Sequence, residues 1–176
     1  MAEDFTKEAL NIRQHLANFE TELSLKAKAH KILILGDYGK NLPMLEQIRI
    51  KLTDGGYPAF LLKDIKNGID VTDYDAAVLL TQNCDLILLL DGNSIGTGVE
   101  CGLIMKSKEL QEKTLFLTSQ SFDALCDTAN PYFYYPIYEY HNNMSEDIIS
   151  KSIGMVKRET YRRAKIYIEL QKSMQI

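Results

Sequence analysis

Residues 84–102 constrain the fold of this 176-residue chain more than any other segment. An uninterrupted apolar run at 86–90 predicts a buried strand over 85–90, and the glycine-rich stretch after it predicts a turn that leads into a helix. Open α/β sheets bind ligands at the carboxyl ends of their strands. We therefore expect Glu100 in the first turn of this helix, with its side chain facing a ligand crevice.

A second apolar run, at 32–35, is followed by Gly36 and then by Pro43, which fits the first turn of a helix. Further strands are predicted at 57–62, 114–118 and 136–140, and further helices at 72–83 and 98–112. Strands that alternate with helices predict an α/β fold with a parallel sheet.

We expect a three-layer, doubly wound sandwich of the flavodoxin-like (Rossmannoid) type, with a five-stranded parallel sheet in the order 2-1-3-4-5. The carboxyl ends of the first and third strands flank the point where the winding reverses. The turns that follow these strands, at 36–38 and 91–98, should therefore converge on one cleft.

The chain is predicted to be a single domain over residues 1–176, with a sheet core at 31–140 and a long helix at each end. In the first helix, at 1–29, apolar residues recur at spacings of four and three: Phe5, Ala9, Ile12, Leu16, Phe19 and Leu23. The last helix spans 145–174 and begins at Ser145. The apolar stripe of the first helix is narrow and suits packing against one or two partner helices. These belong either to the protein's own domain or to a homo-oligomer formed through the terminal helices.

The composition argues against several classes of protein. Hydrophobic residues make up 45% and charged residues 25%, as in ordinary globular domains, and a formal charge of -4 argues against nucleic-acid binding. No apolar run is long enough to span a membrane and no signal pattern opens the chain, so a cytoplasmic protein without a membrane partner is expected.

The cysteines and histidines predict neither a disulfide framework nor a metal site, and no cofactor is predicted. Three cysteines occur without paired spacing, and three histidines lie far apart in the chain. Cys84 and Cys101 are expected to be small buried hydrophobic residues.

Glu100 has two interpretations from the sequence. The chain has neither a P-loop nor a dinucleotide fingerprint, but Gly96, Thr97 and Gly98 precede an expected helix start, where backbone N–H groups favour anions. An acid there either stabilises the helix dipole or acts on a ligand. The glycines around it, at 92, 96, 98 and 102, would let a ligand approach closely and favour the second interpretation.

The segment 94–102, Ser-Ile-Gly-Thr-Gly-Val-Glu-Cys-Gly, resembles a turn of the nucleoside 2-deoxyribosyltransferase superfamily, Asp-x-Gly-Thr-x-x-Glu-x-Gly. It resembles TIR-type NAD-cleaving domains more distantly, and in topology the resemblance covers about 31–119. It implies that Glu100 attacks or stabilises the anomeric carbon while the base departs.

Departures from this family pattern weaken the case for deoxyribosyl transfer. Ser94 stands where the family has Asp, and the helix Asp that assists proton transfer to the base falls near Ala77, with Asp73 and Asp75 close by. A base that leaves more readily, such as nicotinamide from NAD, would need this Asp less. Asp85 matches the family's strand-opening Asp but lies at the wrong end of its strand for catalysis, so it is interpreted as structural.

Two further groups of residues are interpreted as structural. The aromatic residues at 132–135, 138 and 140 are expected at a sheet edge or a subunit contact rather than stacked on a base. The basic residues of the last helix are expected on a solvated face, because acidic residues are interspersed among them: Lys157, Arg158, Arg162, Arg163 and Lys165.

The sequence thus predicts a protein that binds a small-molecule nucleoside or nucleotide and cleaves or transfers at its N-glycosidic bond, with Glu100 as the catalytic group. The expected substrate-binding residues come from the two turns: Gly36, Asp37, Tyr38, Asp91, Gly92, Asn93, Ser94, Thr97 and Gly98. A noncatalytic nucleotide-sensing or assembly module on the same fold is the first alternative. A helix-mediated interaction domain is the second.

Overall fold

The computed structural model describes residues 2–66, 72–90, 95–118, 138–139 and 145–174. These residues form two compact units, one made of Met1–Ala29 with Lys157–Ile176 and the other of His30–Val156. The sequence predicts a single domain over the whole chain, whereas the structure places the first helix and the end of the last helix in a unit of their own. The last helix, which runs through both units, explains why the sequence shows no boundary.

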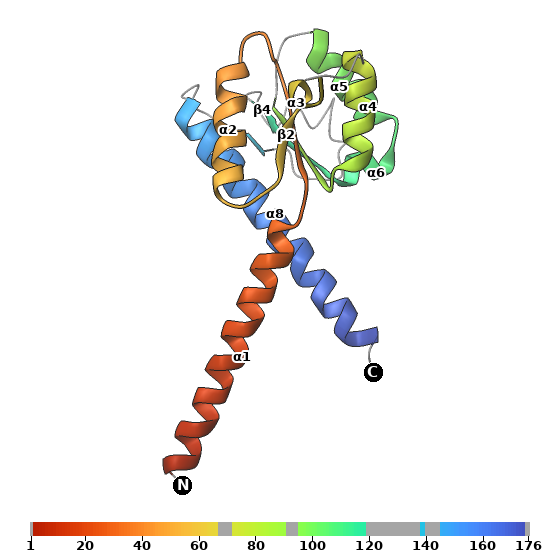
Figure 1. The fold of residues 1–176 in the computed structure, drawn as a ribbon. Helices are drawn as coiled ribbons and strands as arrows, with labels where there is room; N and C mark the ends of the chain where they lie inside the picture. Colours follow the sequence, from red (N-terminus) through yellow and green to blue (C-terminus); the bar gives the residue numbers. More distant parts are fainter. Residues whose placement is uncertain (1, 67–71, 91–94, 119–137, 140–144, 175–176) are drawn as a thin grey trace. The chain divides into compact units, whose positions relative to one another are not determined.

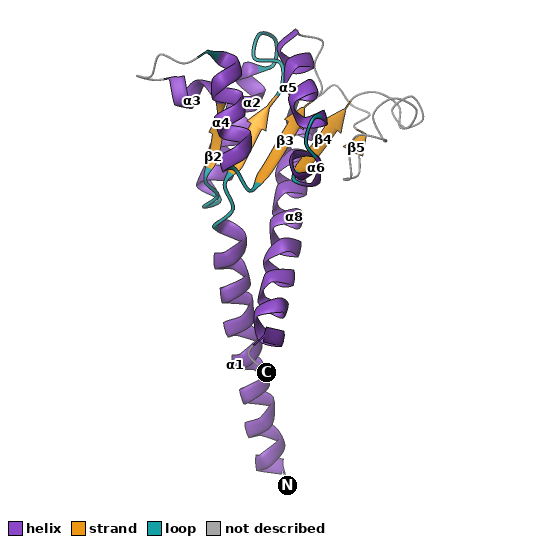
Figure 2. Cartoon of the chain, turned by 90° about the vertical axis from the view of Figure 1, so that its right-hand side faces the viewer, coloured by secondary structure: helices purple, strands orange, loops and turns teal. Residues whose placement is uncertain are grey.

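A parallel sheet forms the centre of the larger unit (Figure 2). Its body consists of β1 (Ile32–Leu35), β2 (Ala59–Leu61), β3 (Leu86–Leu90) and β4 (Thr114–Thr118), in the predicted order β2-β1-β3-β4. The two residues of β5 (Tyr138–Glu139) pair in parallel with the end of β4. Of the fifth strand predicted at 136–140, only these two residues are described.

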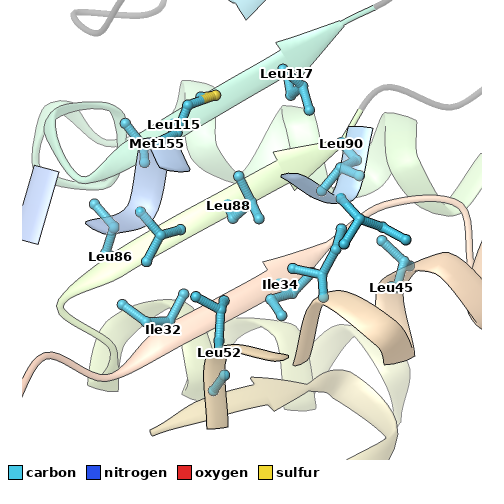
Figure 3. Packing of buried hydrophobic residues seen from close by; sticks show 14 of the residues in the cluster. Ile32, Ile34, Leu45, Leu52, Leu86, Leu88, Leu90, Leu115, Leu117 and Met155 are labelled. Carbon is cyan, nitrogen blue, oxygen red and sulfur yellow. The ribbon is translucent and has the colours of Figure 1, made fainter. Parts of the chain in front are cut away.

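Two helices cover one face of the sheet, α2 (Leu42–Asp54) and the first part of α8 (Ser145–Met174). Every second side chain of β1 and β3 points into this layer, as expected for the two-residue period of a strand. Figure 3 shows these side chains interleaved with those of the two helices: Ile32, Ile34, Leu86, Leu88 and Leu90 with Leu45, Leu52 and Met155.

The opposite face packs against α3 (Leu62–Lys66), α4 (Asp73–Asn83), α5 (Ile95–Met105) and α6 (Lys108–Glu112) (Figure 1). The alternate residues of β1 and β3 point to this side, among them Leu33, Leu35, Ile87 and Leu89. Both central strands are therefore buried on both faces, which requires the continuous apolar runs seen in the sequence. The expected three-layer, doubly wound architecture is present.

Two predicted elements differ in their bounds. The strand predicted at 57–62 is shorter, because the chain turns into α3 at Leu62. The helix predicted at 98–112 is two helices, because Ser107 interrupts it and caps α6 by accepting a hydrogen bond from the N–H of Leu110 (3.4 Å). Because α5 begins at Ile95, Glu100 lies in the second turn of this helix. The sequence predicts the first turn, and the earlier start of the helix corrects this.

Side-chain hydrogen bonds fix the starts of β1 and α4. The Oδ2 atom of Asp85 accepts a hydrogen bond from the N–H of Lys31 (2.7 Å) just before β1, which confirms its structural interpretation. Thr72 caps α4 by accepting from the N–H of Asp75 (3.1 Å), and its hydroxyl donates to the Asp75 carboxylate (2.6 Å).

The smaller unit pairs α1 (Ala2–Lys28) with the second part of α8. The ammonium group of Lys26 lies 4.7 Å from the centre of the Tyr167 ring, and that of Lys172 lies 5.0 Å from the centre of the Phe19 ring. The earlier residue of α1 meets the later residue of α8, so the helices run antiparallel. Among the described helices, none is both long and apolar enough to cross a membrane.

Candidate functional site

The carboxyl ends of β1 and β3 lie side by side, with Leu35 paired to Leu89. Gly36 follows β1 and passes very close to the end of β3. A Cβ atom on Gly36 would lie 3.2 Å from the carbonyl oxygen of Leu90 and 3.3 Å from Leu45 Cδ2, tighter than ordinary contact. Glycine is therefore needed here for the backbone to turn at the predicted switch point.

Asp37 is buried and closes the turn after β1. Its Oδ1 atom accepts hydrogen bonds from the N–H groups of Gly39 (3.0 Å) and Lys40 (3.1 Å). Its carbonyl oxygen accepts from the N–H of Asn41 (2.8 Å), immediately before α2. These bonds hold the carboxylate of Asp37 in one place at the end of the sheet.

Tyr38 links two elements through its hydroxyl group. The hydroxyl donates to the carbonyl oxygen of Ile34 (2.8 Å) and accepts from the N–H of Leu62 (3.0 Å), which joins β1 to the start of α3. Because the hydroxyl serves these backbone partners, the half-buried ring is the part of Tyr38 that could contact a ligand.

Glu100 lies on the stripe of α5 that faces the protein interior. Thr97, Glu100 and Ile104 are all buried and recur at spacings of three and four, which places them on one side of the helix. Only 4% of Glu100 is exposed. A carboxyl group thus occupies a position where an apolar side chain would be expected.

Burial raises the pKa of Glu100 to about 8. A hydrogen bond from the Gly36 backbone acts in the opposite direction, and the negative charge of Asp37 raises the pKa further. The Glu100 carboxyl is therefore mostly protonated at neutral pH. These effects also show that Glu100 meets the turn after β1, as the predicted convergence of the two segments requires.

One oxygen of Glu100 has no hydrogen-bond partner among the described residues. This atom is Oε2, and it is fully buried. Buried polar atoms are almost always paired, because an unpaired one costs about 1–3 kcal/mol. A buried acid with a strongly raised pKa, beside a second acid at the ligand-binding end of the sheet, is typical of a functional site.

The two neighbours of Glu100 that the sequence predicted to bind substrate lie in different surroundings. Thr97 is buried on the same stripe, whereas Gly98 is exposed, and a Cβ atom on Gly98 would meet nothing within 4 Å. Contacts with the described protein atoms therefore do not explain why position 98 is a glycine. Of the other predicted residues, Asp91, Gly92, Asn93 and Ser94 lie outside the described residues.

The position of the family's helix Asp holds no acid. Ala77 is buried among the apolar residues that cover the sheet, and Asp75 is bonded to Thr72 at the start of α4. Among the described residues, the two carboxyl groups that meet at the ends of β1 and β3 are those of Glu100 and Asp37. The sequence carried a signal for the earlier start of α5 that the prediction missed, since Ser94 immediately precedes Ile95 and serine is a common residue before a helix.

Within the described residues, no group of three His, Cys, Asp or Glu residues could hold a metal ion. Cys84 is buried, and burial raises its pKa to about 11, so its thiol stays protonated and unreactive. This confirms the interpretation of Cys84 as a small hydrophobic residue. Cys101 is only partly buried, against the same apolar layer.

No protein-family model matches the chain, and no curated protein matches it. Among solved structures, the chain is similar to a diflavin flavoprotein A3 from Nostoc sp., with a TM-score of 0.46 and 11% sequence identity. The match covers 80% of this chain and 97% of the other. A likeness at this level carries no argument about function, and the assignment to the flavodoxin-like type rests on the strand order and layers.

Proposed function

We propose that this protein binds a nucleotide at the carboxyl end of its sheet and cleaves or transfers at the N-glycosidic bond, using Glu100. The observation that carries the proposal is the buried carboxyl of Glu100, next to Asp37, with one oxygen that has no hydrogen-bond partner among the described residues. The similarity of residues 94–102 to the deoxyribosyltransferase turn supports the same role.

The two carboxyl groups favour a substrate with a positively charged base. Glu100 and Asp37 repel each other when both are ionised, which helps to keep Glu100 protonated in the free protein. A cationic ring bound beside them would favour the ionised form of Glu100. NAD, whose nicotinamide ring is a cation, fits this requirement better than a neutral deoxynucleoside does.

The bond changes are consistent with a site that lacks the family's second Asp. As the C1′–N bond breaks, its electron pair leaves with the base, and a pyridinium nitrogen becomes neutral without gaining a proton. The Glu100 carboxylate stabilises the positive charge that develops on the sugar, or it forms an ester at C1′. Water or an acceptor hydroxyl then attacks C1′ and loses its proton to the solvent.

The test is to incubate the protein with NAD and, separately, with a panel of deoxynucleosides, and to measure the free base by chromatography. We expect nicotinamide to be released from NAD, and the Glu100→Gln variant to lose at least about 100-fold in rate. Glu112→Gln is the matched control, because Glu112 is an exposed residue that pairs with Lys108 at 3.7 Å. Circular dichroism should show that both variants fold.

A noncatalytic nucleotide-sensing or assembly role is the second candidate. It is favoured by Ala77 and Ser94, which stand where the similar family has acids. Binding of NAD without release of any base would support this role and reject catalysis. Absence of both binding and turnover would reject both candidates.

A further inference from the structure

The apolar stripe of α1 is covered at one end and exposed at the other. Ala27 is fully buried and Phe19 and Leu23 are half-buried, whereas Ile12 and Leu16 are each 56% exposed. Spacings of four, three and four place Ile12, Leu16, Phe19 and Leu23 on a single face of the helix. The exposed part is therefore a continuation of a face that already packs within the chain.

The described part of α8 does not reach this continuation. Its Lys172 lies against Phe19, and α8 ends two residues later, at Met174. Residues 2–18 of α1 precede this contact, and both views show α1 continuing past the end of α8 (Figures 1 and 2). Helices in proteins gain most of their stability from packing of their apolar face, so a partner is expected for this stretch.

The second part of α8 carries an exposed apolar stripe of its own. Tyr167, Leu170 and Met174 recur at spacings of three and four, and all three are exposed. The smaller unit thus presents one largely exposed apolar stripe on each of its two helices. Two such helix pairs can bury all of these stripes in a four-helix bundle.

The charges of the two helices are complementary. Residues 2–22 contain five acidic and two basic residues, whereas residues 157–174 contain six basic and two acidic residues. Opposite charges of this kind attract when α1 of one copy lies against α8 of another. In a two-fold symmetric pair, the same attraction occurs twice.

We infer that a second copy of this chain covers these stripes, so that the protein is a homodimer held by a four-helix bundle of α1 and the second part of α8 from each protomer. This inference is independent of the proposed function, because it uses only residues of the smaller unit.

The test compares two double variants of the full chain by sedimentation equilibrium. Ile12→Lys with Leu16→Lys should weaken dimerisation by at least about 100-fold, because two apolar contacts are replaced by charges. The matched control is Leu10→Lys with Leu25→Lys, which adds the same charge to the same helix. Leu10 and Leu25 are 60% and 68% exposed but lie on the opposite side of α1 from the stripe, so the control should remain dimeric.

Added salt should weaken the wild-type dimer, since part of the attraction comes from opposite charges. Circular dichroism should report that both double variants keep their helices. A wild-type protein that is monomeric up to about 100 µM would overturn the inference. Equal weakening by the two double variants would overturn it as well, because the stripe would then not be the interface.

Discussion

At the scale of single residues, the turn after β1 and the interior face of α5 bring two carboxyl groups to one end of the sheet. Asp37 is held there by backbone hydrogen bonds, and Glu100 is buried with one oxygen that has no hydrogen-bond partner among the described residues. An uncharged amide at position 100 would be easier to bury. Retaining an acid there costs stability, which is the usual situation at a site that has been shaped by function.

This cost should depend on pH. The Glu100 carboxyl loses its proton near pH 4.5 in the unfolded chain but only near pH 8 in the folded protein. Between these values the unfolded chain holds fewer protons, so the free energy of unfolding should fall as pH rises, by up to about 1.4 kcal/mol per pH unit. Urea unfolding at several pH values across this window measures the slope.

The Glu100→Gln variant should lose this part of the pH dependence, because it has no carboxyl group to ionise. It should be more stable than the wild type at about pH 8, by on the order of a few kcal/mol. The Glu112→Gln control should keep the wild-type slope, since Glu112 is exposed. Identical slopes for the wild type and Glu100→Gln would contradict the presence of a buried, neutral Glu100.

At the scale of elements, α5 is a short helix that contains three glycines, at 96, 98 and 102, in eleven residues. Glycine in a helix costs about 0.5–1 kcal/mol relative to alanine. Because a Cβ atom on Gly98 would meet nothing within 4 Å, packing does not require this cost. Gly98 lies on the exposed side of α5, where a ligand that approaches the helix backbone closely would account for this cost.

Gly98→Ala should therefore stabilise the protein by about 0.5–1 kcal/mol and weaken nucleotide binding. Gly154→Ala in α8 is the matched control, since Gly154 also lies in a helix and its Cβ atom would also meet nothing within 4 Å. It should stabilise the protein similarly and leave binding unchanged. Thermal unfolding and calorimetric titration with NAD measure the two effects, and unchanged binding in Gly98→Ala would place the ligand elsewhere.

At the scale of the whole molecule, the chain has two separate packing units, and α8 contributes to both. In the larger unit α8 buries residues such as Ile149 and Val156 against the sheet. In the smaller unit it buries Ala164 and Ile168. One continuous stripe of α8 therefore serves two different cores.

A substitution in one core should speed hydrogen exchange mainly in the unit that contains it. Ile168→Ala removes a buried side chain of the smaller unit and should speed exchange in α1 and the second part of α8, with little effect on the strands. Leu88→Ala, in the centre of the sheet, should destabilise the larger unit by about 2–5 kcal/mol and speed exchange in its strands. Equal effects of both variants on both units would show that the chain unfolds as one cooperative domain.

The sequence determined the elements whose formation depends on neighbouring residues. The apolar runs gave β1, β3 and β4 nearly to the residue, because strands buried on both faces need continuous apolar side chains. The stripe of the first helix and Ser145 gave the long terminal helices. The order β2-β1-β3-β4 followed from the alternation of strands and helices together with the handedness of their crossovers.

Only the tertiary structure decided features that depend on contacts between distant segments. The protonation of Glu100 comes from its burial and from Gly36 and Asp37, more than 60 residues away in the chain, and no local pattern reports this. The division into two units depends on where α8 leaves the sheet and meets α1, while the sequence of α8 continues as one helix through that point. Periodicity shows which face of a helix is apolar, but the identity of the segment that covers it is set by the fold.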